Sequence, residues 1–126
     1  MVNNSRKEAG NAKKVSQMIV ELAEDYIRIG DSLEKMQSYL NSACSAWNIA
    51  NLPFNKRQQA LESYLLKYQI LNPGIDDVSN LKHDMQILIK KKLEMFPRVK
   101  KQIVDARIVE DGDEYNIITY SAQKSG

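Results

Sequence analysis

The first third of the chain alternates between hydrophobic and polar positions with the period of a helix. Apolar side chains recur every three or four residues, which predicts a helix over residues 11 to 29. Gly30 follows at once, where glycine commonly ends a helix. The apolar face of this helix consists of Val15, Met18, Ile19, Leu22 and Tyr26.

The same period continues in a second stretch that ends before Pro53. Asp31 or Ser32 is suited to cap the start of this helix, and Glu34, three residues after Asp31, fits a capping box. Its continuous apolar stripe consists of Leu33, Met36, Leu40, Ala43, Cys44 and Trp47.

Two further helices are predicted before Pro97. Asn55 is a suitable cap for the third, which ends at residues 72 to 74, Asn-Pro-Gly. The fourth starts near Asp76 or Asp77. The apolar positions are Ala60, Leu61, Tyr64, Leu65 and Tyr68 in the third, and Val78, Leu81, Met85, Leu88, Leu93 and Phe96 in the fourth.

After Pro97 the period changes to two, which indicates strands. Val104, Ala106 and Ile108 alternate with Ile103, Asp105 and Arg107, and the dipeptide at 111–112, Asp-Gly, is typical of a tight hairpin turn. A two-residue loop there pairs Ile108 with Tyr115 and Ala106 with Ile117. Because an isolated hairpin is marginally stable in water, we expect it to lie on the helices or to pair with another strand. The alternative is that residues 99 to 108 continue as helix, since proline is accepted in a first turn.

The predicted fold is therefore α+β and mainly helical, a bundle of about four helices with a C-terminal antiparallel β-hairpin. One domain spans residues 11 to 122 with the hairpin at about 103 to 120, and we expect flexible segments at 1–10 and 123–126. A chain of 126 residues suffices for one hydrophobic core. No apolar run approaches the ~18 residues of a membrane span, and no signal peptide is evident, so we expect a cytoplasmic protein without membrane contact.

Cys44 and Trp47 are the only cysteine and the only tryptophan of the chain. A single cysteine forms no internal disulfide. Its sequence neighbours supply neither a cation nor a histidine to activate the thiol, and both residues lie on the apolar stripe. We interpret them as core residues rather than a reactive site.

Metal binding is disfavoured by the composition. His83 is the only histidine, and zinc requires three or four ligands. We interpret it as a surface or boundary residue. The acidic residues of the first two helices leave open a divalent-cation site in a helical-bundle hydrolase, although a solvated acidic face and a cap explain them better. They are Glu21, Glu24, Asp25, Asp31 and Glu34.

Residues 90 to 101 form the most strongly charged stretch, with six basic residues against Glu94. Phosphate or nucleic-acid contact is one interpretation, but the net charge of +2 is low for a nucleic-acid-binding domain. Cations also compensate the dipole at the end of the fourth helix. The candidates are Lys90, Lys91, Lys92, Arg98, Lys100 and Lys101, with Arg6, Lys7, Lys13 and Lys14 as a further basic group.

No phosphate-binding glycine loop or nucleophile motif occurs, so we assign no catalytic, cofactor-binding or metal-binding residue. We favour a small non-enzymatic interaction module, a regulatory or accessory subunit of bacterial or phage type that forms a homo-oligomer or binds a protein partner. Tyrosines suit such interfaces. The candidate interface residues are Tyr115, Ile117, Ile118 and Tyr120, and the alternatives are a nucleic-acid-binding protein and a metal-dependent hydrolase.

Overall fold

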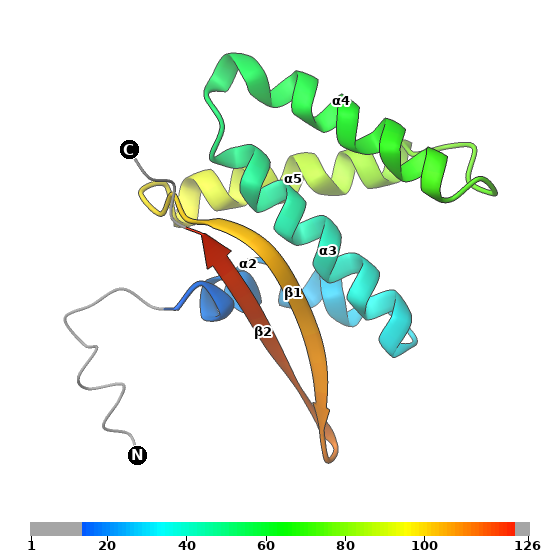
Figure 1. Ribbon diagram of the computed structural model, residues 1–126, viewed down its shortest axis with the longest axis vertical. Coiled ribbons are helices and arrows are strands. Elements are labelled where there is room, and N and C mark those ends of the chain that lie inside the picture. The colour runs from blue at the N-terminus through cyan, green and yellow to red at the C-terminus, as the bar shows by residue number, and fades with distance from the viewer. Residues whose placement is uncertain (1–13, 123–126) are drawn as a thin grey trace.

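The computed structural model describes residues 14–122 and has the predicted fold class: four helices followed by an antiparallel hairpin (Figure 1). The flexible ends predicted at 1–10 and 123–126 lie outside the described residues. The elements are α2 (Val15–Arg28), α3 (Leu33–Ala50), α4 (Phe54–Leu71), α5 (Ser79–Met95), β1 (Gln102–Asp111) and β2 (Glu114–Ala122).

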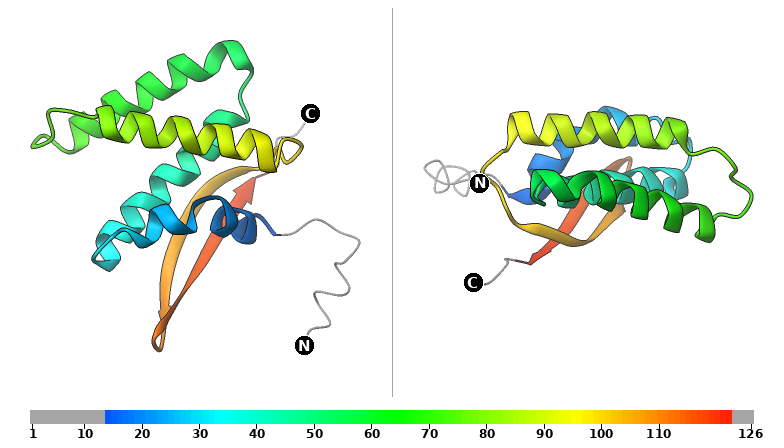
Figure 2. Two further views of the ribbon diagram at one scale, coloured as in Figure 1. Left: turned by 180° about the vertical axis from the view of Figure 1, so that it is seen from behind. Right: turned by 90° about the horizontal axis from the view of Figure 1, so that it is seen from above.

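Helix α3 is the central element of the fold. It packs against α2, α4, α5 and β1 but does not contact β2. The hairpin lies along one side of the helices, as the view from above shows (Figure 2). The small side chains at positions 42, 43 and 46 of α3 are fully buried, which lets neighbouring elements approach closely.

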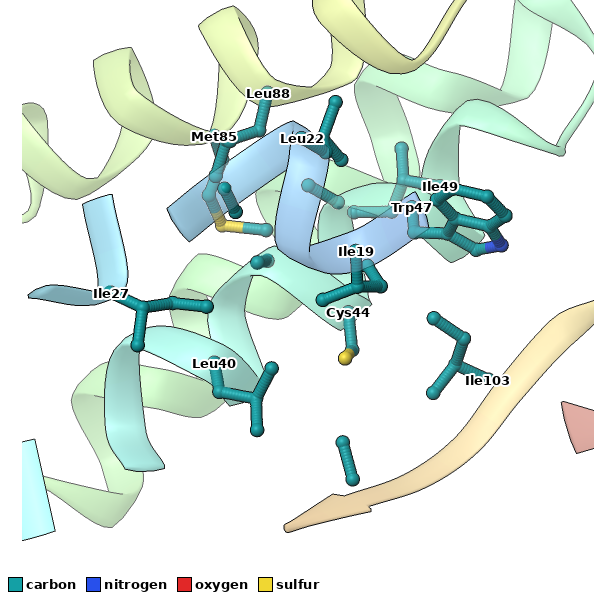
Figure 3. Close-up of a cluster of buried hydrophobic side chains, with 14 of the residues drawn as sticks. Ile19, Leu22, Ile27, Leu40, Cys44, Trp47, Ile49, Met85, Leu88 and Ile103 are labelled. Carbon is teal, nitrogen blue, oxygen red and sulfur yellow. The ribbon is translucent and has the colours of Figure 1, made fainter. Parts of the chain in front are cut away.

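The core forms where α2, α3, α5 and β1 meet. Trp47, Ile19 and Leu40 are completely buried there, and Cys44 lies among them (Figure 3). The interpretation of Cys44 and Trp47 as core residues is confirmed. Trp47 also contacts the ring of Phe96, with 6.0 Å between ring centroids.

The helix starts differ from the predictions in detail. Ser32 is the cap of α3, accepting a hydrogen bond from the Lys35 backbone at 3.1 Å. Asn55 does not cap α4, because the cap position is Pro53, two residues earlier, and Asn55 lies inside the helix. Helix α5 begins at Ser79, whose backbone N–H donates to the Asp77 carboxylate at 2.9 Å.

The hairpin is confirmed, and the helical alternative for residues 99 to 108 is wrong. The predicted register is also wrong by two residues: Ile108 pairs with Ile117, and Ala106 with Thr119. The loop residues are Gly112 and Asp113, and only Gly112 has a positive φ, 65°. A turn of this type needs glycine at its first central position, which explains the shift.

A β-bulge between Ile103 and Asp105 changes which side chains of β1 face the helices. The prediction put Val104 on the apolar face, but 63% of it is exposed, whereas Ile103 is buried with Ala106 and Ile108. One extra residue on a strand reverses the alternation on either side of it. Ile103 thereby joins the core.

Candidate interaction surface

A row of four amide side chains and one cysteine runs along one face of α3. Its members are spaced by four, three, four and three residues, which keeps them on one side of a helix. They are Gln37, Asn41, Cys44, Asn48 and Asn51. We call this row the amide row; strand β1 runs beside it.

Two members of the amide row bind the backbone of β1 in bidentate fashion. Asn48 donates through Nδ2 to the carbonyl oxygen of Ile103 and accepts from its N–H through Oδ1, both at 2.8 Å. Gln37 donates through Nε2 to the carbonyl oxygen of Ala106 at 2.9 Å and accepts from the N–H of Ile108 at 3.0 Å. Each amide therefore replaces the hydrogen bonds that a neighbouring strand would make.

The spacing of the two amides matches the strand. Eleven residues of helix and five residues of strand each span about 16 Å. Two further groups in the first half of this edge also have partners. The carbonyl oxygen of Lys101 accepts from Trp47 Nε1 at 2.8 Å and from Asn51 Nδ2 at 3.2 Å, and the N–H of Ala106 donates to the Asp105 carboxylate at 2.9 Å. Helix α3 therefore covers the edge of β1 at Ile103, Ala106 and Ile108.

The opposite edge of the hairpin, on β2, has no such cover. In an antiparallel pair, residues alternate between pointing their backbone groups at the partner strand and away from it. Since Ala106 and Ile108 point theirs at α3, their partners Thr119 and Ile117 point theirs away from β1. Within residues 14–122 no hydrogen bond reaches these groups of Ile117 or Thr119. Strand β1 lies between α3 and β2 (Figures 1 and 2).

The four candidate interface residues all lie on this open strand, but they face two ways. Ile118 and Tyr120 share the outer face and are 40% and 51% exposed. Ile117 faces the helices and packs against the core, and Tyr115 shares its side but is exposed near the tip. The structure therefore assigns Ile117 partly to the core.

The six basic candidates do not form one surface. Lys90, Lys91, Arg98, Lys100 and Lys101 are exposed, whereas Lys92 is fully buried. Lys91 also donates to the carbonyl oxygen of Leu22 at 2.9 Å. Of the further basic group, Arg6, Lys7 and Lys13 lie outside the described residues.

Lys92 instead joins α5 to α3 and to the segment before β1. Its ammonium donates to Asn51 Oδ1 and to the carbonyl oxygen of Val99, both at 2.6 Å, and lies 4.8 Å from the centre of the Trp47 ring. Burial, and then the positive charges of Lys100 and Arg57, lower the pKa of Lys92 to about 8. Lys92 lies four residues after the buried Leu88, a spacing that could have identified it as a core position.

The other candidates for chemistry are not assembled into a site. Burial, with a smaller contribution from Asp105, raises the pKa of Cys44 to about 12, so its nucleophilic form is suppressed. His83 is exposed, as the surface interpretation predicts. Glu24 pairs with Arg28 at 2.8 Å and Asp31 with Lys35 at 3.4 Å. Among residues 14–122 no three His, Cys, Asp or Glu side chains are placed to hold a metal ion.

A recess of about 150 Å³ lies between α2 and α5. Burial, and secondly the charge of Asp84, raise the pKa of Tyr26 in its wall well above the usual range. The recess is smaller than the roughly 300 to 1,000 Å³ typical of ligand pockets. Its lining consists of Leu22, Asp25, Tyr26, Asp84, Ile87, Leu88 and Lys91.

Comparison of the chain with protein-family models, curated proteins and solved structures finds no match. None of the helices in residues 14–122 is both long and apolar enough to cross a membrane. The contrast between the β1 and β2 edges of the hairpin is the most specific geometric feature of residues 14–122.

Proposed function

We propose that the chain is a small non-enzymatic interaction module that acts through protein–protein contacts of its hairpin and forms a homo-oligomer. The observation that carries the proposal is the difference between the two edges. Side chains of α3 bind backbone groups of Ile103, Ala106 and Ile108 on β1. The backbone groups of Ile117 and Thr119 have no partner within residues 14–122.

The composition of β2 supports pairing. Proteins usually protect exposed edge strands with lysine, proline, an inward-pointing charge or a bulge. Strand β2 has the sequence EYNIITYSA, in which Glu114 at the tip is the only charged residue, and the bulge lies on β1 instead. A nine-residue strand with an uncharged edge and exposed Ile118 and Tyr120 is suited to accept another strand.

Nucleic-acid binding is the second candidate function. The observation favouring it is that Lys90, Lys91, Arg98, Lys100 and Lys101 are exposed at and just after the end of α5. The burial of Lys92 removes one of the six cations on which the hypothesis depends. Phosphate contacts would make retention of nucleic acid strongly salt-dependent.

The test is size-exclusion chromatography at low salt, with the light-scattering mass and the absorbance of protein and nucleic acid recorded on one peak. We expect a mass at least twice 14.4 kDa and no excess nucleic-acid absorbance. Ile118→Lys should return the chain to the monomer, because the substitution places a cation on the open strand. Ile70→Lys is the matched control, since Ile70 is an equally apolar, 69% exposed residue on α4.

A monomeric wild-type chain at all accessible concentrations would contradict the proposal. A peak that carries nucleic acid and loses it at high salt would favour the second candidate instead.

A further inference from the structure

We infer that the strand accepted by β2 is the β2 of a second copy, paired antiparallel about a two-fold axis at Ile118. The result is a continuous four-stranded sheet with the order β1-β2-β2-β1. This inference rests on the proposed function and specifies its partner and contact. Two-fold dimers use the same patch on both copies, so the edge must complement itself.

The backbone of β2 meets this requirement. Ile118 is the middle residue of Glu114–Ala122, so an axis there aligns all nine residues of both strands. Ile117 then lies opposite Thr119 of the second copy, and Tyr115 opposite its Ser121. These residues point their backbone groups toward the open edge, because they alternate with residues that point theirs at β1. Every open donor therefore meets an open acceptor.

The side chains are compatible with the same register. On the outer face Ile118 meets its own copy, and Asn116 meets Tyr120, whose hydroxyl can bind the amide. On the inner face Ile117 meets Thr119, a pair of β-branched residues. Glu114, the only charge on the strand, lies opposite Ala122, so no like charges face each other.

The competing candidate for this edge is the chain's own segment at residues 1–13, because α2 packs against β2. Its sequence, MVNNSRKEAGNAK, does not alternate and has one β-branched residue, Val2. Such a sequence is poorly suited to a strand. Strand β2 itself has the composition of a strand, which favours the second copy.

Disulfide trapping tests the register. At the axis, Ile118 forms a pair without backbone hydrogen bonds, with Cα atoms about 4.5 Å apart, a separation that a disulfide can bridge. We expect Ile118→Cys to give covalent dimer as the main product under mild oxidation. The native thiol, Cys44, is buried and does not interfere.

Val109→Cys is the matched control. Val109 is exposed on the same outer face, but it lies on β1, so the two copies of it are separated by three strand spacings, about 14 Å. In this register the two copies are also offset by four residues, about 13 Å, along the strands, so we expect no cross-link. A mixture of Asn116→Cys and Tyr120→Cys chains should give the mixed dimer, and each variant alone should remain monomeric under denaturing conditions.

Each outcome is decisive. An oligomer by light scattering in which Ile118→Cys and the mixed pair both fail to cross-link overturns the inference and leaves the proposed function standing. Cross-linking of Asn116→Cys or Tyr120→Cys alone overturns the register, and cross-linking of Val109→Cys indicates face-to-face packing instead. A strictly monomeric chain removes both proposals.

Discussion

Asn48 and Ile103 exchange two hydrogen bonds, each 2.8 Å long, although 55 residues separate them in the chain. The side-chain amide of Asn48 acts toward the strand as a backbone peptide would. Together with Gln37 it makes α3 the neighbour of β1 that a third strand would otherwise be. This contact orients the hairpin so that β2 lies on the side away from α3.

Replacing Asn48 with alanine should lower the free energy of unfolding by about 2 kcal/mol, because a donor and an acceptor of Ile103 lose their partners in a largely buried setting. Urea unfolding followed by Trp47 fluorescence measures the change. Asn55→Ala is the control, since Asn55 is exposed on α4 and should change stability by less than about 0.5 kcal/mol. Equal midpoints for the two variants would contradict the role of Asn48.

Gly112 and Gly74 allow the effect of backbone conformation on stability to be separated from the effect of side-chain contacts. A Cβ would meet nothing within 4 Å at either Gly112 or Gly74, but only Gly112 has a positive φ. Gly112→Ala should therefore destabilise by about 1 kcal/mol, whereas Gly74→Ala should be neutral or slightly stabilising. Thermal unfolding of the two variants tests this, and a destabilised Gly74→Ala with an unaffected Gly112→Ala would refute the turn assignment.

The Cys44 thiol should react with a disulfide reagent only when the chain opens. Its pKa of about 12, against an ordinary 9.0, leaves roughly a thousandfold less thiolate near neutral pH. Because the folded state retains this proton longer than the unfolded state, stability should fall as pH rises above 9. Labelling rates that follow urea-induced unfolding would support the account. Rapid labelling of the native chain would show that the thiol is accessible.

Lys92 should have the opposite effect on stability at slightly lower pH. Its pKa falls from 10.5 to about 8 on folding, so the unfolded chain binds more protons between these values and the free energy of unfolding rises with pH. This gain is lost as pH falls through about 8. The neutral amine retains two N–H groups for Asn51 and Val99.

Between pH 8 and 9 the change in stability reports the titration of Lys92, since the effect of Cys44 on stability begins above pH 9. Urea unfolding of the wild type should show stability rising across this interval, and Lys92→Met should flatten the rise. Identical slopes for the two proteins would show that the amine titrates alike in the folded and unfolded chains.

The sequence predicts the positions of the helices and strands better than it predicts which residues pair between the strands. Apolar periodicity predicts all four helices of residues 14–122, and Ser32 is one of the two predicted caps of the second. The predicted hairpin register is wrong because the run Asp-Gly-Asp at 111–113 allows two different two-residue turns. In the structure the turn residues are Gly112 and Asp113, and only Gly112 has a positive φ. The bulge near Val104 has no marker in the local pattern.

The candidate surface was only partly predictable. The residues of β2 are among the predicted interface residues, but the amide row of α3 is not, because Gln37 and Asn48 are polar and lie outside the apolar stripe. Their regular spacing with Asn41 and Asn51 was the available signal. Lys92 was misread because its neighbours Lys90 and Lys91 are exposed cations, although its spacing from Leu88 matches the buried stripe.

Amide hydrogen exchange at several protein concentrations tests the central claim, that α3 closes one edge of the hairpin and a second copy covers the other. The N–H of Ile108, bound by Gln37, should be protected at every concentration. The N–H groups of Ile117 and Thr119 should gain protection as concentration rises. Rapid exchange of these two at all concentrations, or protection independent of concentration, would contradict the account.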